Sequence, residues 1–258
     1  MKYISIIILL TISSVAIFSP FFIDYNPNLM DLSLRACQPS KEHILGCDLY
    51  GRDLLSGLII GSQITMYIST SIVLITCLIG LFIGLSAGFF GGLFDLIVVR
   101  IIDLFLAFPG ILLAMFLISL LGPNINNIII SISITGWTSI ARICRSQVIS
   151  LKSKEYIIAN QAIGSSKFRT LIKHIFPATL VQLMTIASFS FSSVIIAEAS
   201  LSFLGLGSPS NIPTWGNLIS QGREVLAERP HLSLAPGILI MAVVLAFNIL
   251  GDSLQEYL

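Results

Sequence analysis

Residues 54–94 read LLSGLIIGSQITMYISTSIVLITCLIGLFIGLSAGFFGGLF and contain no Asp, Glu, Lys or Arg. Residues 104–141 form a second stretch from which these four residue types are absent. A helix that crosses the hydrocarbon core of a bilayer, about 30 Å thick, needs roughly 20 mainly apolar residues. Each stretch is longer than that, so the chain is predicted to be a membrane protein.

The composition of the whole chain agrees with this prediction. Hydrophobic residues make up 55% of the 258 residues and charged residues only 10%, with a mean hydropathy of +0.94, whereas charged residues make up about 25% of an average soluble domain. The net charge of +1 lacks the positive excess of nucleic-acid-binding proteins, so we exclude that class. A chain of this length can supply about six spans with a few loops.

We therefore expect six transmembrane segments, separated by charged or turn-forming residues. Each must be helical, because lipid offers no hydrogen-bond partner to an unpaired backbone group. The predicted fold class is all-α, a polytopic membrane protein. The expected spans are residues 3–23, a segment within 66–88, and residues 97–121, 125–143, 178–204 and 234–254.

The first apolar run, residues 3–23, is either a membrane span or a signal peptide. A signal peptide has an apolar core of about 7–15 residues and a small-residue cleavage site. This run is longer and has no clear site of that kind. We favour an uncleaved first span.

Positive charge is concentrated in one segment. Residues 142–177 read RICRSQVISLKSKEYIIANQAIGSSKFRTLIKHIFP and hold seven of the fourteen Lys and Arg residues. Because Lys and Arg near span ends stay cytoplasmic, we place this basic segment and both chain ends inside; with Lys2 and Arg100, nine of the fourteen cations then lie inside. The outer segments are about 24–60 and 205–233. The expected organisation is an N-terminal helix with an extracytoplasmic segment, residues 1–60, followed by a five-helix membrane domain, residues 61–258.

The basic segment has the pattern of a helix, a turn and a second helix. Apolar residues fall at 158, 159, 162 and 163 before Gly164 and at 168, 171, 172 and 175 after it, which is helical spacing. Gly164 suits the turn because glycine adopts positive φ at little cost, and Pro177 can open the next span, where no helical N–H is needed. These residues fit equally well an amphipathic loop on lipid phosphates and a docking surface for a soluble partner.

Two motifs in the basic segment, EYIIANQAIG from Glu155 and HIFP from His174, resemble the coupling loop of permease subunits in binding-protein-dependent ABC importers. The pattern of that loop is Glu-Ala-Ala-x3-Gly-x9-Ile-x-Leu-Pro. Ala159, Gly164 and Pro177 match it, and the spacing from Gly164 to Pro177 is that of the family. The positions that depart from the pattern are Ile158, Asn160, His174 and Phe176.

Further motifs make the resemblance more specific. They occur in the order expected of the second permease subunit in dipeptide, oligopeptide and nickel importers, and they cover the chain from about residue 27 to its end. One departure is Cys47, which stands where that family has Thr. The motifs are LGCDLYGRDLLSGLIIG from Leu45, AGFFGG from Ala87, the Asp95, Arg100, Asp103 and AFP series, EASLSFLGLG from Glu198, TWG from Thr214 and FNILGD from Phe247.

The resemblance implies a type I ABC importer permease fold in the bacterial inner membrane, with a coupling loop at about residues 150–176. Residues 155–164 would form the coupling helix, a lever gripped by an ATPase. The residues to which the resemblance assigns this coupling role are Glu155, Ala159, Gly164 and Pro177.

The same resemblance implies that ATP hydrolysis takes place on other polypeptides. The sequence has no Gly-x4-Gly-Lys-Ser/Thr loop, the usual cradle for ATP phosphates. We therefore expect no catalytic residue, no cofactor on this chain, and ATP with Mg²⁺ on the partner subunits. The implied partners are two cytoplasmic ATPases, a homologous second permease, an extracytoplasmic substrate-binding protein and the lipid bilayer.

The implied cargo is a short peptide, with nickel or a nickel complex as the alternative within the same family. Two other classes of membrane protein are remote alternatives. An intramembrane enzyme would need buried nucleophiles or a His-Glu-x2-His pair, and the sequence has no such motif. An ion channel would have no use for an ATPase-docking helix.

Small and polar residues inside the spans suggest packing and pathway positions. Gly80, Gly84 and Gly88 recur on one helix face, where small residues let a second helix approach closely; we favour a seam within this subunit over a contact between subunits. Thr185, Ser188 and Ser192 also share a face. They could line a polar pathway or bond back to carbonyls of their own helix, and the sequence does not decide between these two.

Charged residues near span ends are expected to pair. An acid within an apolar span indicates a function or a partner; for Glu198 we favour a pairing with an outer arginine such as Arg223 over contact with cargo. Asp95, Arg100 and Asp103 are expected to form helix-end pairs, with no chemical role.

Two of the four cysteines fall in the first outer segment. Cys37 and Cys47 could be free thiols, could form a disulfide in an oxidising compartment, or could bind a soft metal together with His43. We favour free thiols, then the disulfide, and predict no metal site. Cys77 and Cys144 lie in or beside spans.

Overall fold

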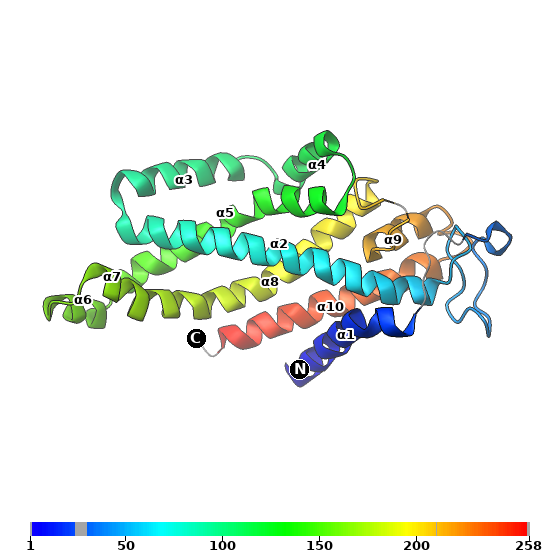
Figure 1. The fold of residues 1–258 in the computed structure, drawn as a ribbon, viewed down its shortest axis with the longest axis horizontal. Coiled ribbons are helices and arrows are strands. Elements are labelled where there is room, and N and C mark those ends of the chain that lie inside the picture. The colour runs from blue at the N-terminus through cyan, green and yellow to red at the C-terminus, as the bar shows by residue number, and fades with distance from the viewer. Residues whose placement is uncertain (1, 24–29, 210, 257–258) are drawn as a thin grey trace.

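The computed structural model describes residues 2–23, 30–209 and 211–256. Long helices lie side by side along one axis, with shorter elements gathered at the two ends of the bundle (Figure 1). The described residues contain no β-strand, only an isolated bridge between Cys47 and Asp53. The all-α prediction is confirmed.

Five helices are long and apolar enough to cross a membrane, and a bent pair supplies a sixth span when it is counted as one. The expectation of six spans is met in this way. The five are α1 (Lys2–Phe22), α2 (Leu54–Phe90), α5 (Ile125–Lys152), α8 (Phe176–Phe203) and α10 (His231–Gln255), and the bent pair is α3 (Gly92–Leu106) with α4 (Gly110–Leu121).

The third expected span, residues 97–121, is not one straight helix. It breaks between α3 and α4, which meet at 80°. Pro109 explains the break, because proline has no N–H to donate and its ring disfavours the helical conformation of the residue before it. In Figure 1, α3 lies beside α2 and α4 turns away over the end of α5.

The second span is longer than expected. Instead of a segment within 66–88, α2 begins after Asp53, whose carboxylate accepts a hydrogen bond from the Ser56 N–H at 2.8 Å, and ends at Gly91 with φ of +68°. At 1.5 Å per residue its 37 residues extend about 55 Å, more than the roughly 30 Å of hydrocarbon. The helix also runs through residue 60, where we expected a boundary between two parts of the chain.

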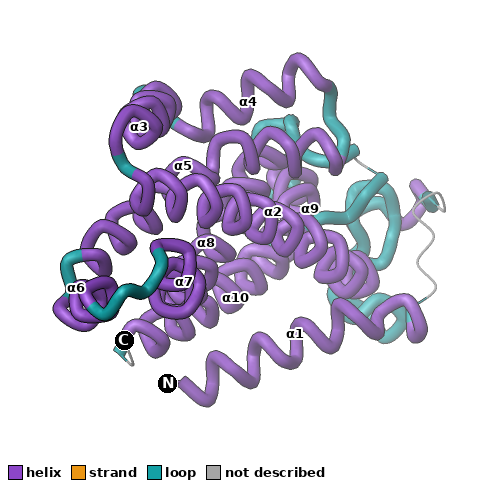
Figure 2. The backbone as a smooth tube through the Cα atoms, turned by 60° about the vertical axis from the view of Figure 1, so that its left-hand side comes forward, coloured by secondary structure: helices purple, strands orange, loops and turns teal. Residues whose placement is uncertain are grey.

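The short elements lie at opposite ends of the bundle. One end holds α6 (Glu155–Ala162) and α7 (Lys167–Thr170), labelled in Figure 2, and the π-helical turn η2 (Leu171–Ile175) that follows them. We call it the α6 end. The other, the α9 end, holds the 3-10 turn η1 (Leu32–Leu34), the loop that follows it, and α9 (Trp215–Arg223). The basic segment and the two expected outer segments are thus separated by the bundle; residues 24–29 lie outside the described residues.

Cys37 and Cys47 form a disulfide at the α9 end, with their Cα atoms 4.9 Å apart. The favoured prediction of free thiols is therefore wrong for this pair. The fold brings the two residues together because the chain turns back on itself: the Cys47 N–H bonds to the Cys37 carbonyl at 3.2 Å. His43 lies elsewhere, with Nδ1 3.1 Å from Oδ1 of Asp53. Cys77 and Cys144 are free and buried.

We expect this disulfide to be visible by counting reactive thiols. A polymer-tagged maleimide should add two tags to the denatured, unreduced protein, for the two free cysteines, and four after reduction. Gel mobility measures the number of tags. The Cys37→Ser variant should give the same number of tags with and without reductant, and four tags on the unreduced wild type would contradict the pairing.

Candidate functional site

The α6 end has the predicted helix, turn and helix. The helix α6 ends before Gly164, which has φ of +92°, a backbone conformation that favours glycine. Ser166 then caps α7: its hydroxyl oxygen accepts a hydrogen bond from the Arg169 N–H at 3.3 Å. The turn at Gly164 is thus fixed by backbone geometry, and the second helix starts in a defined direction.

Contacts behind α6 fasten it to the bundle. The Ile157 side chain is completely buried and belongs to the main hydrophobic core. Asn160 donates a hydrogen bond from Nδ2 to the Thr170 hydroxyl at 3.1 Å, which joins α6 to α7. The rings of Tyr156 and His174 meet edge to face, with their centroids 6.5 Å apart. A displacement of α6 must therefore move the helices on which it rests.

The outward side of the loop around Gly164 carries large apolar side chains among exposed charged ones, which include Lys154, Glu155, Lys167 and Arg169. Ile163 is 88% exposed, Phe168 72% and Ile158 54%. Large apolar side chains gathered at a surface mark a site that contacts protein or membrane. They surround the Gly164 turn, so the segment that resembles a coupling loop presents a surface suited to docking.

The four residues assigned to coupling all lie in or beside this loop. Glu155 and Ala159 are exposed on α6, and Gly164 forms the turn. Pro177 differs from expectation, because it does not open a new helix. The chain is helical from Lys167 onward, and the Phe176 N–H bonds to the Leu171 carbonyl in a π-helical turn. This wider turn, η2, lies directly before the proline, where the regular helical bonding pattern loses one N–H donor.

The three glycines of α2 lie against α5. A Cβ added at Gly80 would lie 2.7 Å from Cβ of Ile140, one at Gly84 would collide with the Ala141 carbonyl oxygen, and one at Gly88 would lie 2.8 Å from the carbonyl oxygen of Arg145. No Cβ fits at these distances. The close approach of α2 and α5 in this chain therefore depends on glycine.

The hydroxyl residues suggested as a pathway are buried. Thr185, Ser188 and Ser192 are each less than 7% exposed. The Ser192 hydroxyl donates to the Val244 carbonyl of α10 at 3.1 Å, and that of Ser188 to the Met184 carbonyl of its own helix at 3.1 Å. Ser188 and Ser192 thus have hydrogen-bond partners inside the bundle, whereas the buried hydroxyl of Thr185 has none among the described residues. The pathway role of the three residues stays a prediction.

A different face of α8 borders a groove. This groove has a volume of about 360 Å³ and lies between α5 and α8, with α2 behind it. Its polar lining consists of Thr76, Ser139, Ser190 and Ser193. These hydroxyls were not predicted, because the serines on the other face of the same helix fit helical spacing equally well. The three-residue spacing of Ser190 and Ser193 was the available signal.

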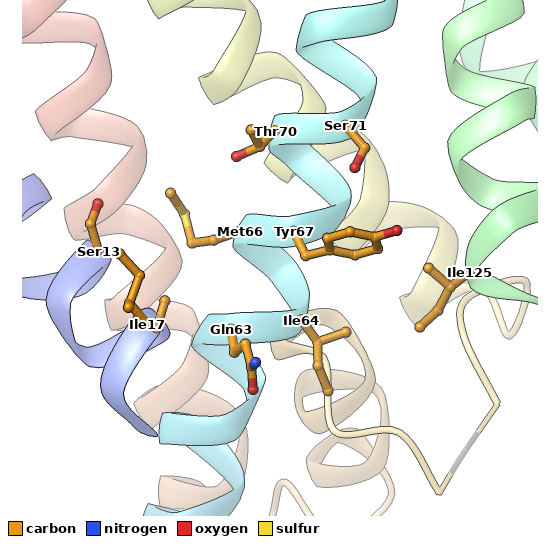
Figure 3. A pocket seen from close by; sticks show the side chains of 10 residues that line it. Ser13, Ile17, Gln63, Ile64, Met66, Tyr67, Thr70, Ser71 and Ile125 are labelled. Carbon is orange, nitrogen blue, oxygen red and sulfur yellow. The ribbon is translucent and has the colours of Figure 1, made fainter. Parts of the chain in front are cut away.

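A second crevice, of about 740 Å³, lies between α1 and α2. Figure 3 shows Tyr67 and Ser71 extending from α2 toward Ile125, while Met66 and Thr70 point to the other side of the helix. Neither α1 nor α2 is joined directly to the coupling loop. This crevice and the α5–α8 groove therefore differ in how they connect to the α6 end.

Comparison with known proteins decides the family. The family model of the binding-protein-dependent transport system inner membrane component matches residues 80–258. The chain belongs to this family. It is a membrane permease component, and the family is not catalytic.

Relatives of this permease match nearly its whole length. The dipeptide transport system permease protein of Alkalihalophilus pseudofirmus is 36% identical over 99% of this chain and 84% of its own length. The oligopeptide transport system permease protein of Bacillus subtilis is 35% identical with the same coverage. The nickel transport system permease protein of Escherichia coli K12 is 32% identical over 98% of this chain and 92% of its own length.

Glu198 of the permease has a partner other than the one expected. Its side chain is 1% exposed, and Oε1 accepts a hydrogen bond from the Ser202 hydroxyl at 2.9 Å. Arg223 instead lies over the Phe203 ring, 4.7 Å from its centroid. The predicted pairing of Glu198 with Arg223 is therefore wrong. The reason is that α9 packs closely on this part of α8 and Gly216 contacts Ser202, which covers the carboxyl group.

Helix α3 is joined to α5 by two ion pairs. Both involve an aspartate of α3 for which we expected a pairing. Asp95 pairs with Arg145, and Asp103 pairs with Arg142 at 2.6 Å. Arg100 is exposed. These pairs hold α3 beside the bundle, and none of them lies in the α5–α8 groove.

Loss of the second pair should cost little. The side chains of Asp103 and Arg142 are 48% and 53% exposed, and exposed pairs contribute roughly 0–1 kcal/mol. We expect Asp103→Asn to lower the free energy of unfolding by less than about 1 kcal/mol. Thermal unfolding of the purified complex measures this; a loss near 3 kcal/mol, typical of a buried pair, would show that the pair is shielded from water.

The α9 end is held by buried polar contacts that the sequence analysis did not identify. Trp215 is fully buried; its indole N–H donates to the Leu58 carbonyl at 3.2 Å, and its backbone N–H to the Thr65 hydroxyl at 3.2 Å. Asp48 and Arg52 form a buried ion pair at 2.7 Å. The two bonds of Trp215 fix α9 on α2, and the ion pair braces the loop that leads into α2.

Proposed function

We propose that this permease carries short peptides across the membrane as one of two membrane subunits of an ABC importer, and that its coupling loop transmits ATP hydrolysis from a separate protein. The observation that carries the proposal is the combination at the α6 end. Exposed apolar side chains surround the Gly164 turn, and the fully buried Ile157 anchors the preceding helix, α6, in the core. Such a loop can bind a partner and pass its movement to the bundle.

The partners follow from the family. They are a homologous second permease, two cytoplasmic ATPases that bind ATP and Mg²⁺, and an extracytoplasmic binding protein that delivers cargo. This chain binds neither ATP nor a cofactor in the proposed complex. Glu155, Ala159 and Gly164 would face the ATPase, and Pro177 with η2 would connect the loop to α8.

The proposed orientation places the α6 end in the cytoplasm of a bacterial cell, with both termini on that side of the cytoplasmic membrane. The α9 end then faces outward. Two observations support this: seven of the fourteen cations lie in the basic segment, and the disulfide lies at the α9 end, where an oxidising compartment would preserve it. Residues 1 to about 60, which precede most of α2, would form the N-terminal helix and an outer segment.

Peptide is the favoured cargo, and a nickel complex is the alternative. The relatives include permeases named for dipeptides, oligopeptides and nickel. A bare divalent transition metal binds best to imidazole, thiolate or carboxylate groups, and none of these lines the α5–α8 groove. This lining therefore suits a cargo with hydrogen-bonding groups better than a bare metal ion.

The test is ATP hydrolysis by the purified complex in lipid, with its binding protein loaded with dipeptides or with chelated nickel. Stimulation by the dipeptide-loaded form is expected. Stimulation by the nickel-loaded form alone would replace peptide by the metal complex. Copurification without any ATPase would overturn the proposal as a whole.

A further inference from the structure

The α5–α8 groove lies between the two helices to which the coupling loop is attached. Helix α5 ends at Lys152, directly before α6, and α8 continues the helical stretch that begins with α7 and η2. A movement of α6 against the bundle therefore acts on both walls of the groove. No other pair of long helices in the described chain is joined by this loop.

Four neutral hydroxyl groups lie within the mainly apolar lining of the groove. The hydroxyl protons of three residues are already donated to their own helices: Thr76 to the Ile72 carbonyl at 2.8 Å, Ser190 to Ile186 at 2.8 Å and Ser193 to Phe189 at 3.2 Å. A hydroxyl bonded in this way still has free lone pairs. The groove thus offers hydrogen-bond acceptors, and these suit a cargo that carries N–H donors.

Room for cargo comes from small residues on α5. Gly136 faces Thr76, and a Cβ at this glycine would lie 3.0 Å from Cγ2 of the threonine. Ser139 is exposed on the same wall. Apolar side chains complete the lining, among them Ile186 and Phe189. Such a mixture of an apolar surface with a few placed polar groups is typical of small-molecule sites.

Helix α10 offers an exposed apolar surface for comparison. Between residues 232 and 250 its exposed side chains are all apolar: Leu234, Ile238, Met241 and Leu245. The groove differs, because hydroxyls from three helices converge on one cavity. These acceptor oxygens give the groove a polar content that a lipid chain cannot use and that a cargo with N–H groups can.

We propose that the α5–α8 groove is the section of the transport path in which this subunit contacts the cargo, and that its hydroxyls accept hydrogen bonds from peptide N–H groups. The proposal rests on the proposed function, since it assumes a peptide importer. It adds the residues that touch the cargo, namely Ser139, Ser190, Ser193 and Thr76. It also states what movement of the coupling loop would change, namely the distance between α5 and α8, the two walls of the groove.

Thiol labelling in the assembled complex tests whether the groove contains water. Ser139→Cys and Ser193→Cys should react with a membrane-impermeant, charged methanethiosulfonate, and dipeptide-loaded binding protein with ATP should change the rate of reaction. Wild-type protein is the background, since its two free cysteines are buried. Met241→Cys, on the exposed apolar face of α10, should stay unreactive. Tyr67→Cys reports on the α1–α2 crevice and should show no dependence on cargo.

Side-chain size tests whether cargo passes through the groove. Ser193→Phe should lower dipeptide uptake to roughly a tenth of the wild-type rate or less, the scale on which a filled pocket excludes its ligand. Met241→Phe should leave uptake unchanged. Copurification of the ATPases with each variant shows that the complex has assembled.

The outcomes separate the two proposals. If Ser139→Cys and Ser193→Cys react no faster than Met241→Cys, the groove is not part of a path and the inference is overturned. If they react but only Tyr67→Cys responds to cargo, the path runs through the crevice instead. If the groove cysteines react and the wild-type complex takes up no dipeptide with any loaded binding protein, the inference about peptide N–H groups fails together with the proposed cargo.

Discussion

Gly164→Trp should abolish cargo-stimulated ATP hydrolysis and uptake while the permease still inserts and assembles. The backbone at Gly164 has φ of +92°, where any residue with a Cβ is strained by roughly 1–2 kcal/mol. A Cβ at Gly164 meets open space, so the indole would add bulk to the exposed surface that carries Ile163 and Phe168. Allosteric coupling is typically worth about 1–3 kcal/mol, or 5- to 150-fold, so a distorted loop can remove most of the response.

A matched control separates coupling from folding. Gly122 has φ of +86° in the turn before α5, and open space surrounds it as it does Gly164. Gly122→Trp therefore carries similar backbone strain at the opposite end of α5. It should leave stimulated ATP hydrolysis within about twofold of the wild type, an effect below the usual coupling scale. If Gly164→Trp takes up cargo at the wild-type rate, the assignment of the coupling loop is contradicted.

The expected size of this effect follows from the way the loop is held. Ile157 is fully buried in the main core, so α6 is part of the packed bundle. The bond between Asn160 and Thr170 links the two sides of the turn at 3.1 Å. A partner that grips the exposed face can therefore move α5 and α8 together, because packed elements transmit small displacements without absorbing them.

The sequence predicted the spans well because the bilayer imposes a simple rule. Stretches without charge, such as residues 104–141, must be helical and must cross or enter the apolar layer. The turn at Gly164 was equally predictable, because the apolar residues follow one helical pattern before this glycine and a second one after it. These features depend on local composition and on the solvent, so the sequence alone reveals them.

Features that depend on contacts between distant segments were not predicted. Pro109 is compatible with a kinked helix and with two separate helices. The packing of α4 on α5 produces two helices, and the sequence does not reveal that packing. The burial of Glu198 was missed because a separate helix, α9, covers it, although its hydrogen-bond partner Ser202 lies only four residues away on α8. The pairing of Cys37 with Cys47 required the chain reversal seen at the α9 end.

The choice between two serine faces of α8 shows the same limit. Ser188 and Ser192 lie on one face, and Ser190 and Ser193 on another, with similar composition. Only the packing of α10 against the first face, through the bond from Ser192 to the Val244 carbonyl, leaves the second face for the groove. Periodicity identifies a face but does not identify what covers it.

Gly84→Leu is expected to destabilise the permease more than the same change at Gly80 or Gly88, the other two glycines on the seam between α2 and α5. A Cβ at Gly84 would overlap the Ala141 carbonyl oxygen and lie 2.8 Å from Cβ of Cys144. Because a backbone atom cannot rotate away, α2 and α5 must separate, and this separation disturbs the packing of the whole seam. Overpacking usually costs about 1–3 kcal/mol, and the upper end of that range applies to a clash with backbone.

The measurement is the midpoint of thermal unfolding of the purified permease, with the yield of assembled complex as a second readout. Gly237→Leu is the matched control, since Gly237 also lies within a long helix, α10, and has open space where the Cβ would be. The free energy of unfolding of this variant should lie within a few tenths of a kcal/mol of the wild-type value, as is usual for surface substitutions. If both variants unfold alike, the close approach of α2 and α5 does not depend on glycine. A low midpoint for Gly84→Leu alone shows that it does, because in lipid helices are held together by tight packing rather than by the hydrophobic effect.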